Sequence, residues 1–195
     1  MATTNIPGYT YGSADLKKSP VSLDDFAKLK QATLFGDDDV RYLKMSHDIL
    51  KDQTEQILDV WYGFVGSTPF LLHYFTNDGQ PNMDYLGAVR KRFGQWILDT
   101  ANANYDQNWL NYQQEIGLRH HSTKKNKTDN VKAVPIIHVH YIFALLIPIT
   151  TTLRPFLEKG GHSRDDVDRM QDAWRKSVLM QVILWSQPYI KEGEF

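Results

Sequence analysis

The chain has 195 residues, of which 42% are hydrophobic, and a formal net charge of −1 at pH 7. That length suffices for one domain with a sizeable core, and the balanced charge gives no reason to expect nucleic acid or an anionic membrane as a partner. Cysteine is absent, which excludes disulfides, thiolate nucleophiles and iron–sulfur clusters and favours a cytoplasmic location.

Residues 1–20 are predicted to form a coil arm, and residues 21–195 a single domain. The arm is rich in Gly, Pro, Tyr and Ser, has no helical period, and lacks the basic and apolar segments of a secretory signal. Ser22, followed by Asp25 three residues later, predicts the start of a short helix that ends near Gly36.

The next part of the chain is also predicted to be helical. Residues 37–66 keep a helical period of apolar residues, with aspartates at the start and a break expected near residues 48–52. Pro69 starts a short apolar segment. The stretch TNDGQPN at 76–82 predicts a turn, and an amphipathic helix follows through residues 85–97.

A helix through residues 109–120 comes next, and a basic loop at 123–130 separates it from an apolar run at 134–149. The loop, which contains the sequence KKNK, is interpreted as solvated. The apolar run is interpreted as one buried helix at the centre of the fold, because it is apolar nearly all round and short for a bilayer span. Pro148 predicts a kink in that helix.

The last long helix is predicted to begin near Ser163, which has Asp166 three residues on, and to end at Pro188. We find no convincing strand alternation and no internal repeat. The chain is therefore predicted to contain six to eight helices joined by short connections, and its fold class is predicted to be all-α.

One apolar stripe of a predicted helix contains a histidine. Trp109, Tyr112, Ile116 and His120 follow one another at spacings of three, four and four residues, so they share one helix face. His121 lies about 100° further round and faces elsewhere. The spacing selects His120 as the inward histidine. A histidine on an apolar face is more often a hydrogen-bonded core residue, and the alternative is that it is a metal or cofactor ligand.

Motifs of other chemical classes are missing from the sequence. Neither the pair His120 and His121 nor the pair His138 and His140 has the i, i+4 spacing of helical metal ligands, and HExxH, P-loop, GxGxxG and GxSxG motifs are absent. Many inward aromatics and one inward histidine suit a flat apolar cofactor held by one imidazole, as haem is in globins. Tyr62 is a candidate to hydrogen-bond a ligand there, because a buried phenol needs a partner.

Seven stretches of the sequence share a family pattern: IPGYTYG (6–12), DVWYGFVGS (59–67), VRKRFGQWILDT (89–100), YDQNWLNYQQEIGLRHH (105–121), TKKNKTDNV (123–131), TTLRPFLEKGGH (151–162) and LWSQPY (184–189). Together they closely resemble the protoglobins, single-domain haem globins related to the globin domains of globin-coupled sensors. The likeness runs from about Ile6 to the last residue. It implies a globin fold with an additional amino-terminal helix, an enlarged two-over-two helical sandwich, and a homodimer formed through the last two long helices.

The resemblance also implies haem b as the cofactor, with His120 as the proximal iron ligand and O2, CO or NO bound at a five-coordinate iron. It implies an aromatic distal side, with Val89 where many other globins have a histidine. Arg92 is a candidate to bind a haem propionate, because a guanidinium matches the geometry of a carboxylate. The expected site consists of Trp61, Tyr62, Phe75, Val89, Arg92, Phe93, Tyr112, Ile116, His120 and Leu145.

Three positions depart from the usual protoglobin pattern: Phe70, His73 and Leu145. All three are expected close to the pocket, where His73 could approach the iron. An alternative function is a haem-dependent enzyme for NO dioxygenation, peroxidase-like oxidation or group transfer, with Tyr62 as its reactive distal residue. The lack of a thiolate ligand and of a distal acid disfavours the oxidative reactions, and Leu145 favours a wider pocket. A gas sensor acting on a separate partner and a haem-free helical interaction protein are the remaining alternatives.

Overall fold

The computed structural model describes residues 6–195, so the first five residues of the expected arm lie outside the described residues. The helices are α1 (Leu23–Ala32), α2 (Asp37–Leu50), α3 (Thr54–Gly66), α4 (Pro69–Leu72), α5 (Met83–Asn102), α6 (Gln107–His120), α7 (Val139–Ala144), α8 (Leu146–Glu158) and α9 (Arg164–Ser186), with 3-10 turns η1 (His73–Phe75) and η2 (Gln187–Tyr189). A hairpin pairs β1 (Thr76–Asn77) antiparallel with β2 (Gln80–Pro81) at the predicted turn. The all-α fold class is confirmed.

Side-chain caps explain where several helices begin. Ser22 accepts a hydrogen bond from the backbone of Asp25 at the start of α1, and Ser163 does the same at the start of α9. Asn82 and Asp106 cap α5 and α6 in the same way. Each cap satisfies an amide that has no partner within its helix. The two predicted serine starts are confirmed, and the expected break between residues 37 and 66 falls at residues 51–53.

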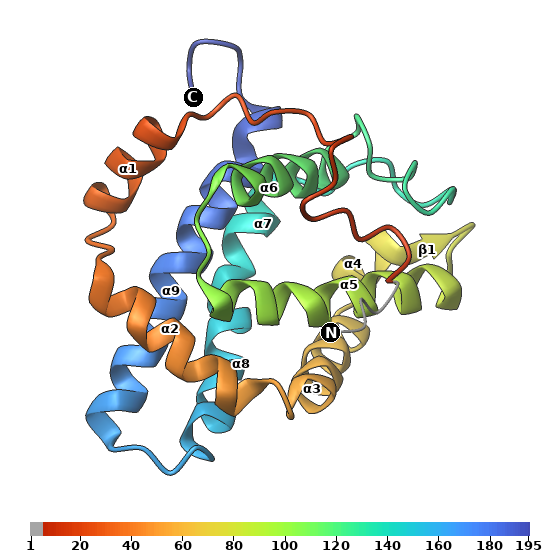
Figure 1. The fold of residues 1–195 in the computed structure, drawn as a ribbon. Helices are drawn as coiled ribbons and strands as arrows, with labels where there is room; N and C mark the ends of the chain where they lie inside the picture. The colour runs from red at the N-terminus through yellow and green to blue at the C-terminus, as the bar shows by residue number, and fades with distance from the viewer. Residues whose placement is uncertain (1–5) are drawn as a thin grey trace.

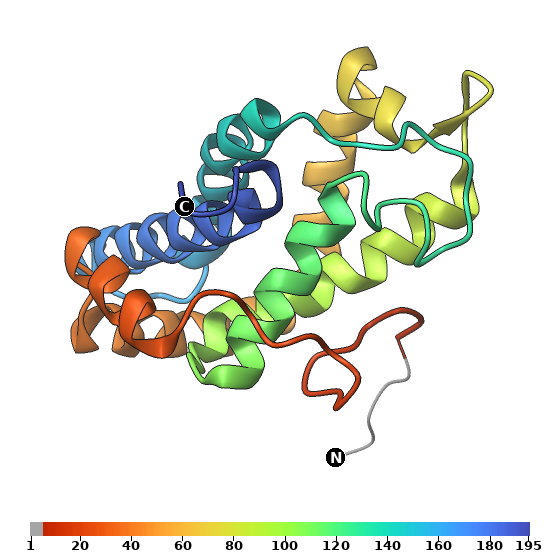
Figure 2. The same ribbon diagram turned by 90° about the horizontal axis from the view of Figure 1, so that it is seen from above.

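The helices form two layers (Figures 1 and 2). Figure 2 shows α5 and α6 crossing on one side and α7, α8 and α9 on the other, with α3 at the end away from α1. Helix α9 packs along α8, α2 and α6, and α5 packs against α2 and α3. The largest fully buried side chains lie in this core and include Leu43, Leu58, Trp109, Met170 and Trp174.

The apolar run at 134–149 is not one central helix, so that prediction was wrong. Residues 134–138 are not helical, α7 begins at Val139, and α8 begins after Leu145. Pro135 disfavours helix in the residue before it, and the missing amide of Pro148 leaves the carbonyl of Ala144 without a helical donor at the place where α7 ends. One side of the run faces solvent, where 63% of Ile147 is exposed, whereas Ile142 on another side is buried and lines the interior cavity described below.

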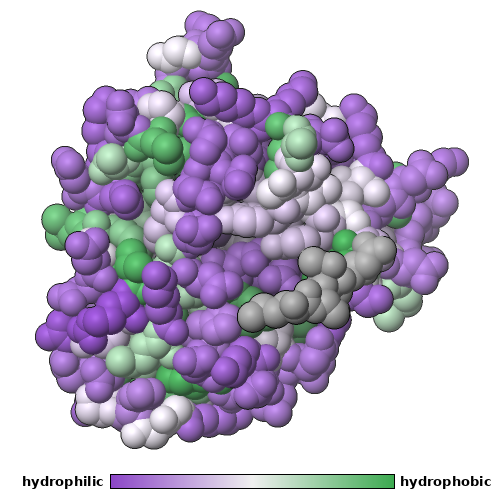
Figure 3. Space-filling view, in the orientation of Figure 1, coloured by the Kyte–Doolittle hydropathy of each residue, from purple (hydrophilic) through white to green (hydrophobic). Residues whose placement is uncertain are grey.

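By length and composition alone, one helical stretch of the described chain, Val139–Glu158, could cross a membrane; its mean hydropathy is 1.2. Core helices of globular proteins satisfy the same test. This stretch is interrupted at Leu145, and its α8 part packs along α9. The face of the molecule in Figure 3 is largely hydrophilic, with separate apolar patches.

The described part of the arm, residues 6–20, contains turns and extended chain but no helix, and it runs past α5 and α6 (Figure 1). The Tyr9 hydroxyl donates to Asp99 of α5 at 2.7 Å, and the Ser19 amide donates to Asn111 of α6 at 2.9 Å. The rings of Tyr9 and Tyr11 meet the ring of Tyr112 edge-on, at centroid distances of 5.3 and 5.4 Å. The arm is therefore bound to the α5/α6 layer.

Candidate functional site

A cavity of about 230 Å³ is lined by residues of both layers. All ten residues of the expected site line it, and they come from α3, η1, α5, α6 and the α7–α8 junction. Sequence reasoning did not single out the rest of the lining, which is supplied by Val65, Leu71, Tyr74, Tyr85, Trp96, Arg119, Lys125, Thr128, Asp129, Ile137, Tyr141, Ile142, Ile149, Val182 and Trp185. Most of these side chains are apolar or aromatic.

His120 presents one ring nitrogen to this cavity. Its Nδ1 lies 2.8 Å from the backbone oxygen of Ile116, which can only accept, so Nδ1 carries the proton and Nε2 has the lone pair. Within residues 6–195, no hydrogen-bond partner is found for Nε2. Burial lowers the pKa of His120, so the ring is neutral at pH 7. A neutral imidazole fixed through its other nitrogen is the usual form of a histidine metal ligand.

Trp185 of α9 holds the other side of the His120 ring. The two rings are nearly parallel, 13° apart, with centroids separated by 5.3 Å. The indole nitrogen of Trp185 donates to Oε1 of Gln113 at 2.8 Å, and both residues are buried. Helices α6 and α9 can approach here because a Cβ at Gly117 would lie only 3.0 Å from the backbone oxygen of Trp185.

His121 is directed away from this cavity and does not line it. Its Nδ1 lies 2.7 Å from the Thr123 hydroxyl, and its ring meets Tyr189 edge-on at 4.9 Å. Adjacent residues on a helix point about 100° apart, which accounts for the difference between His120 and His121.

Aromatic side chains form the cavity wall near α3 and α5. The ring of Phe93 lies 5.7 Å from that of Trp61, 6.5 Å from that of Tyr62 and 5.3 Å from that of Trp96. Burial raises the pKa of Tyr62, so its phenol stays protonated at neutral pH. In the described part of the chain its hydroxyl makes no hydrogen bond, while the Arg90 guanidinium lies 5.6 Å from its ring centroid.

Two of the three unusual positions, Phe70 and His73, do not line the cavity, although each packs against a residue that does. Phe70 is 54% exposed and packs against Tyr141 at 5.3 Å, and neither Phe70 nor His73 is a lining residue. Both residues lie in the short segment of α4 and η1, which is too brief for a helical period to show which side chains face inward. Leu145 does line the cavity.

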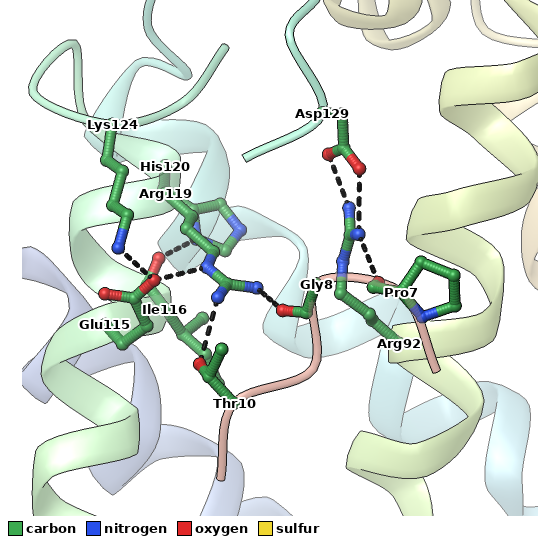
Figure 4. Close-up of polar contacts among 10 residues, drawn as sticks. All are labelled: Pro7, Gly8, Thr10, Arg92, Glu115, Ile116, Arg119, His120, Lys124 and Asp129. Atoms are coloured by element: carbon green, nitrogen blue, oxygen red, sulfur yellow. Dashed lines mark hydrogen bonds and ion pairs between the residues drawn. The ribbon is translucent and has the colours of Figure 1, made fainter. Parts of the chain in front are cut away.

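Two arginines lie where the arm meets the cavity (Figure 4). Arg92 donates to both carboxylate oxygens of Asp129, at 2.9 and 2.6 Å, and to the backbone oxygen of Pro7. Arg119 donates to Glu115 at 2.7 Å and to the backbone oxygen of Gly8 at 2.6 Å. Each guanidinium is thus neutralised by an acid and also holds the arm.

Lys125 also lines the cavity, and the expectation of a solvated loop was wrong for this residue. It is only 2% exposed, and its ammonium donates to the backbone oxygen of Tyr74 at 3.0 Å. Burial lowers its pKa to about 8. A lysine inside a run of polar residues gives no periodic signal of burial, so the sequence did not reveal it.

The residues of this cavity fit a haem group. One neutral imidazole offers a free nitrogen, the wall is aromatic and aliphatic, and cationic side chains stand at one edge. Within residues 6–195 there is no cluster of three or more His, Cys, Asp or Glu side chains that could hold a metal ion by itself. A metal here would therefore have to bring other ligands, as the iron of a porphyrin does.

The fold and this cavity define a globin-type haem protein. The solved globin domain of the Geobacter sulfurreducens globin-coupled sensor superposes with a TM-score of 0.66 at 14% sequence identity, covering 85% of this chain and 97% of that one. The protoglobin family model matches residues 22–195, so the chain belongs to the protoglobin family. Among curated protein sequences, none matches this chain.

Proposed function

We propose that this protein binds haem b, which Nε2 of His120 would hold, and that the bound haem would take O2, CO or NO as its ligand. The proposal rests on one observation above all: the Ile116 carbonyl holds the Nδ1 proton of His120, which leaves a neutral Nε2 facing an aromatic cavity. When bound, haem supplies an iron with one position open to a diatomic ligand.

The protein's own residues have distinct tasks in this proposal. The hydrogen bond to Ile116 orients the His120 ring and makes Nε2 a stronger donor to the metal. Trp61 and Phe93 keep water from the ligand side because they present only apolar ring surface and a single indole N–H. Tyr62, a neutral phenol with a hydrogen to donate, is the candidate to stabilise the bound ligand.

Absorption spectroscopy tests the proposal. The wild-type protein, reconstituted with haem, should give a Soret band that shifts on reduction and again on addition of CO. The variant His120→Ala should lose the five-coordinate ferrous spectrum, and imidazole added in solution should restore it. His121→Ala is the matched control and should keep the wild-type spectrum, because His121 lies outside the cavity. A normal ferrous spectrum in His120→Ala would exclude His120 as the ligand.

Enzymatic chemistry at the same iron is the alternative function. Asp129 is the one carboxylic acid in the described lining, and it is paired with Arg92, so the cavity offers no free carboxylate for proton transfer. Tyr62 is left as the candidate reactive group. Turnover above that of free haem, lost in Tyr62→Phe, would favour the enzyme over the gas-binding protein.

We also propose a cytoplasmic homodimer formed through α8 and α9. Ile147 of α8 and Leu179 of α9 are 63% and 37% exposed, and burial of such side chains would favour association. Sedimentation equilibrium should give twice the monomer mass for the wild-type protein and a weaker dimer for Leu179→Glu. A monomer at all concentrations would contradict this proposal.

A further inference from the structure

Three cationic side chains line the cavity, and two of them are already neutralised. Arg92 is paired with Asp129, whose side chain is 12% exposed, and Arg119 is paired with Glu115, whose side chain is 6% exposed. Although burial opposes it, bonds from Lys124 and Arg119 lower the pKa of Glu115, so this acid is ionised. Both guanidinium charges therefore meet an opposite charge inside the protein.

Lys125 is the exception among these three cations. Within residues 6–195 no carboxylate lies within ion-pair distance of its ammonium, whose contacts are the Tyr74 backbone oxygen at 3.0 Å, the Asn126 side-chain oxygen at 3.5 Å and the Tyr85 ring at 5.3 Å. All of these partners are neutral. A buried charge without an opposite charge is costly, because water no longer solvates it.

A second polar group of the same loop and of the same cavity lining also lacks a partner. The hydroxyl oxygen of Thr128 is buried and makes no hydrogen bond in the described chain, and Thr128 lines the cavity three residues after Lys125. Buried hydroxyls are normally hydrogen-bonded, and an unpaired one needs an explanation. A ligand with an anionic, hydrogen-bonding group at this edge would satisfy both residues.

We propose that Lys125, assisted by Thr128, forms an anion subsite of the cavity that binds a carboxylate of the porphyrin, and that Lys125 rather than Arg92 supplies most of the preference for that carboxylate. This inference rests on the haem function proposed above. It replaces Arg92, the candidate that the sequence suggested for a haem propionate, with Lys125. Asp129 already occupies both nitrogens of the Arg92 fork that would grip a carboxylate. An incoming carboxylate would have to displace Asp129 from Arg92, whereas at Lys125 it meets an unbalanced positive charge.

The test compares protoporphyrin IX with its dimethyl ester, both without iron, by titrating the apoprotein and following quenching of tryptophan fluorescence. The ester has the same ring but no carboxylates, and the absence of iron removes any bond to His120. Wild-type protein should bind the diacid at least about tenfold more tightly than the diester. Lys125→Met should lose most of this preference, and Lys125→Arg should keep it. Thr128→Val should reduce it in part.

Lys127→Met is the matched control, because Lys127 is an exposed lysine on the same loop. It should keep the wild-type preference. The proposal is overturned if Lys125→Met keeps the preference, if Arg92→Gln loses it while Lys125→Met does not, or if the wild-type protein binds diacid and diester equally. Wild-type protein that binds neither porphyrin and also gives no Soret band with haem would overturn the haem function as well, whereas a Soret band without any preference for the diacid would overturn only the anion subsite.

Thermal unfolding of the apoprotein gives a second readout that needs no ligand. If the function of Lys125 is to bind an anionic ligand, Lys125→Met should raise the unfolding temperature of the apoprotein. An apolar side chain of similar length then replaces a buried charge that has no opposite charge nearby. A lysine that served only to hold the Tyr74 backbone oxygen would give the opposite result on substitution. A fall in the unfolding temperature of Lys125→Met would therefore count against the proposal.

Discussion

At the scale of single residues, the orientation of His120 depends on a residue that does not touch the cavity. Gln113 accepts the indole hydrogen of Trp185, and Trp185 lies flat against the His120 ring. We expect Gln113→Leu to lower the free energy of unfolding by about 1–3 kcal/mol, because the buried indole N–H loses its acceptor. Urea unfolding measures this. Gln114→Leu is the control at a less buried neighbour. Equal losses of stability at both positions would contradict the role of Gln113 as the acceptor for Trp185.

Tyr62 allows a prediction about ligand release. Its hydroxyl makes no hydrogen bond in the described chain, so removing it should cost the apoprotein little stability. If the phenol donates to bound O2, then Tyr62→Phe should speed O2 dissociation roughly two- to tenfold, since one neutral hydrogen bond contributes about 0.5–1.5 kcal/mol. Stopped-flow displacement of O2 by CO measures the rate. Tyr105→Phe, which removes a hydroxyl bonded to Ser177, should leave that rate unchanged.

At the scale of whole elements, the close contact between α6 and α9 forms the side of the cavity that holds His120. A methyl group at Gly117 would lie 3.0 Å from the Trp185 oxygen and 3.1 Å from its Cα, both backbone atoms. Gly117→Ala should therefore push the helices apart, lower the free energy of unfolding by about 1–3 kcal/mol, and weaken haem binding.

Gly63 in α3 provides the opposite control for that prediction. It has open space around the position of a Cβ. Gly63→Ala should raise the free energy of unfolding by about 0.5–1 kcal/mol, because alanine loses less backbone entropy in a helix than glycine. Chemical unfolding of both variants distinguishes a close helix contact from the general effect of glycine. A stabilised Gly117→Ala would show that α6 and α9 can separate without cost.

Helical elements were predictable from the sequence where a regular period marks a buried face. The stripe of α6 contains Tyr112, Ile116 and His120, and all three line the cavity. The loop at 123–130 has no period, and the burial of Lys125 depends on where η1 lies, which no local pattern records. The prediction for the apolar run at 134–149 was wrong for a related reason, because composition alone does not distinguish a helix that is buried on all sides from one with a solvent-facing side.

At the scale of the whole molecule, the arm makes stability depend on pH. Burial raises the pKa of Asp99, although bonds from Gln95 and Tyr9 oppose the shift. The folded protein therefore binds the Asp99 proton more tightly than the unfolded chain does. The stability that this proton contributes is fully present below the ordinary pKa of aspartate and is lost as the pH rises through the raised value in the folded protein.

Asp99→Asn tests this dependence, because an amide remains able to accept from Tyr9 without becoming charged. Its free energy of unfolding should equal that of the wild type in acid and should exceed it increasingly as the pH rises toward neutral. Urea unfolding between pH 4 and pH 8 measures the difference. The exposed Asp52→Asn is the control and should follow the wild-type profile. A constant difference across this range would contradict the role of Asp99.

The way in which the arm is attached has a consequence for how its sequence can change. Arg92 and Arg119 donate hydrogen bonds to the backbone oxygens of residues 7 and 8, and every amino acid has such an oxygen. Gly8 alone is restricted there, since its φ is +75° and a Cβ would lie 2.7 Å from the Arg92 guanidinium. Position 7 should therefore accept many different residues and position 8 only glycine, whereas the tyrosines at 9 and 11 are fixed by their side-chain contacts with Asp99 and Tyr112.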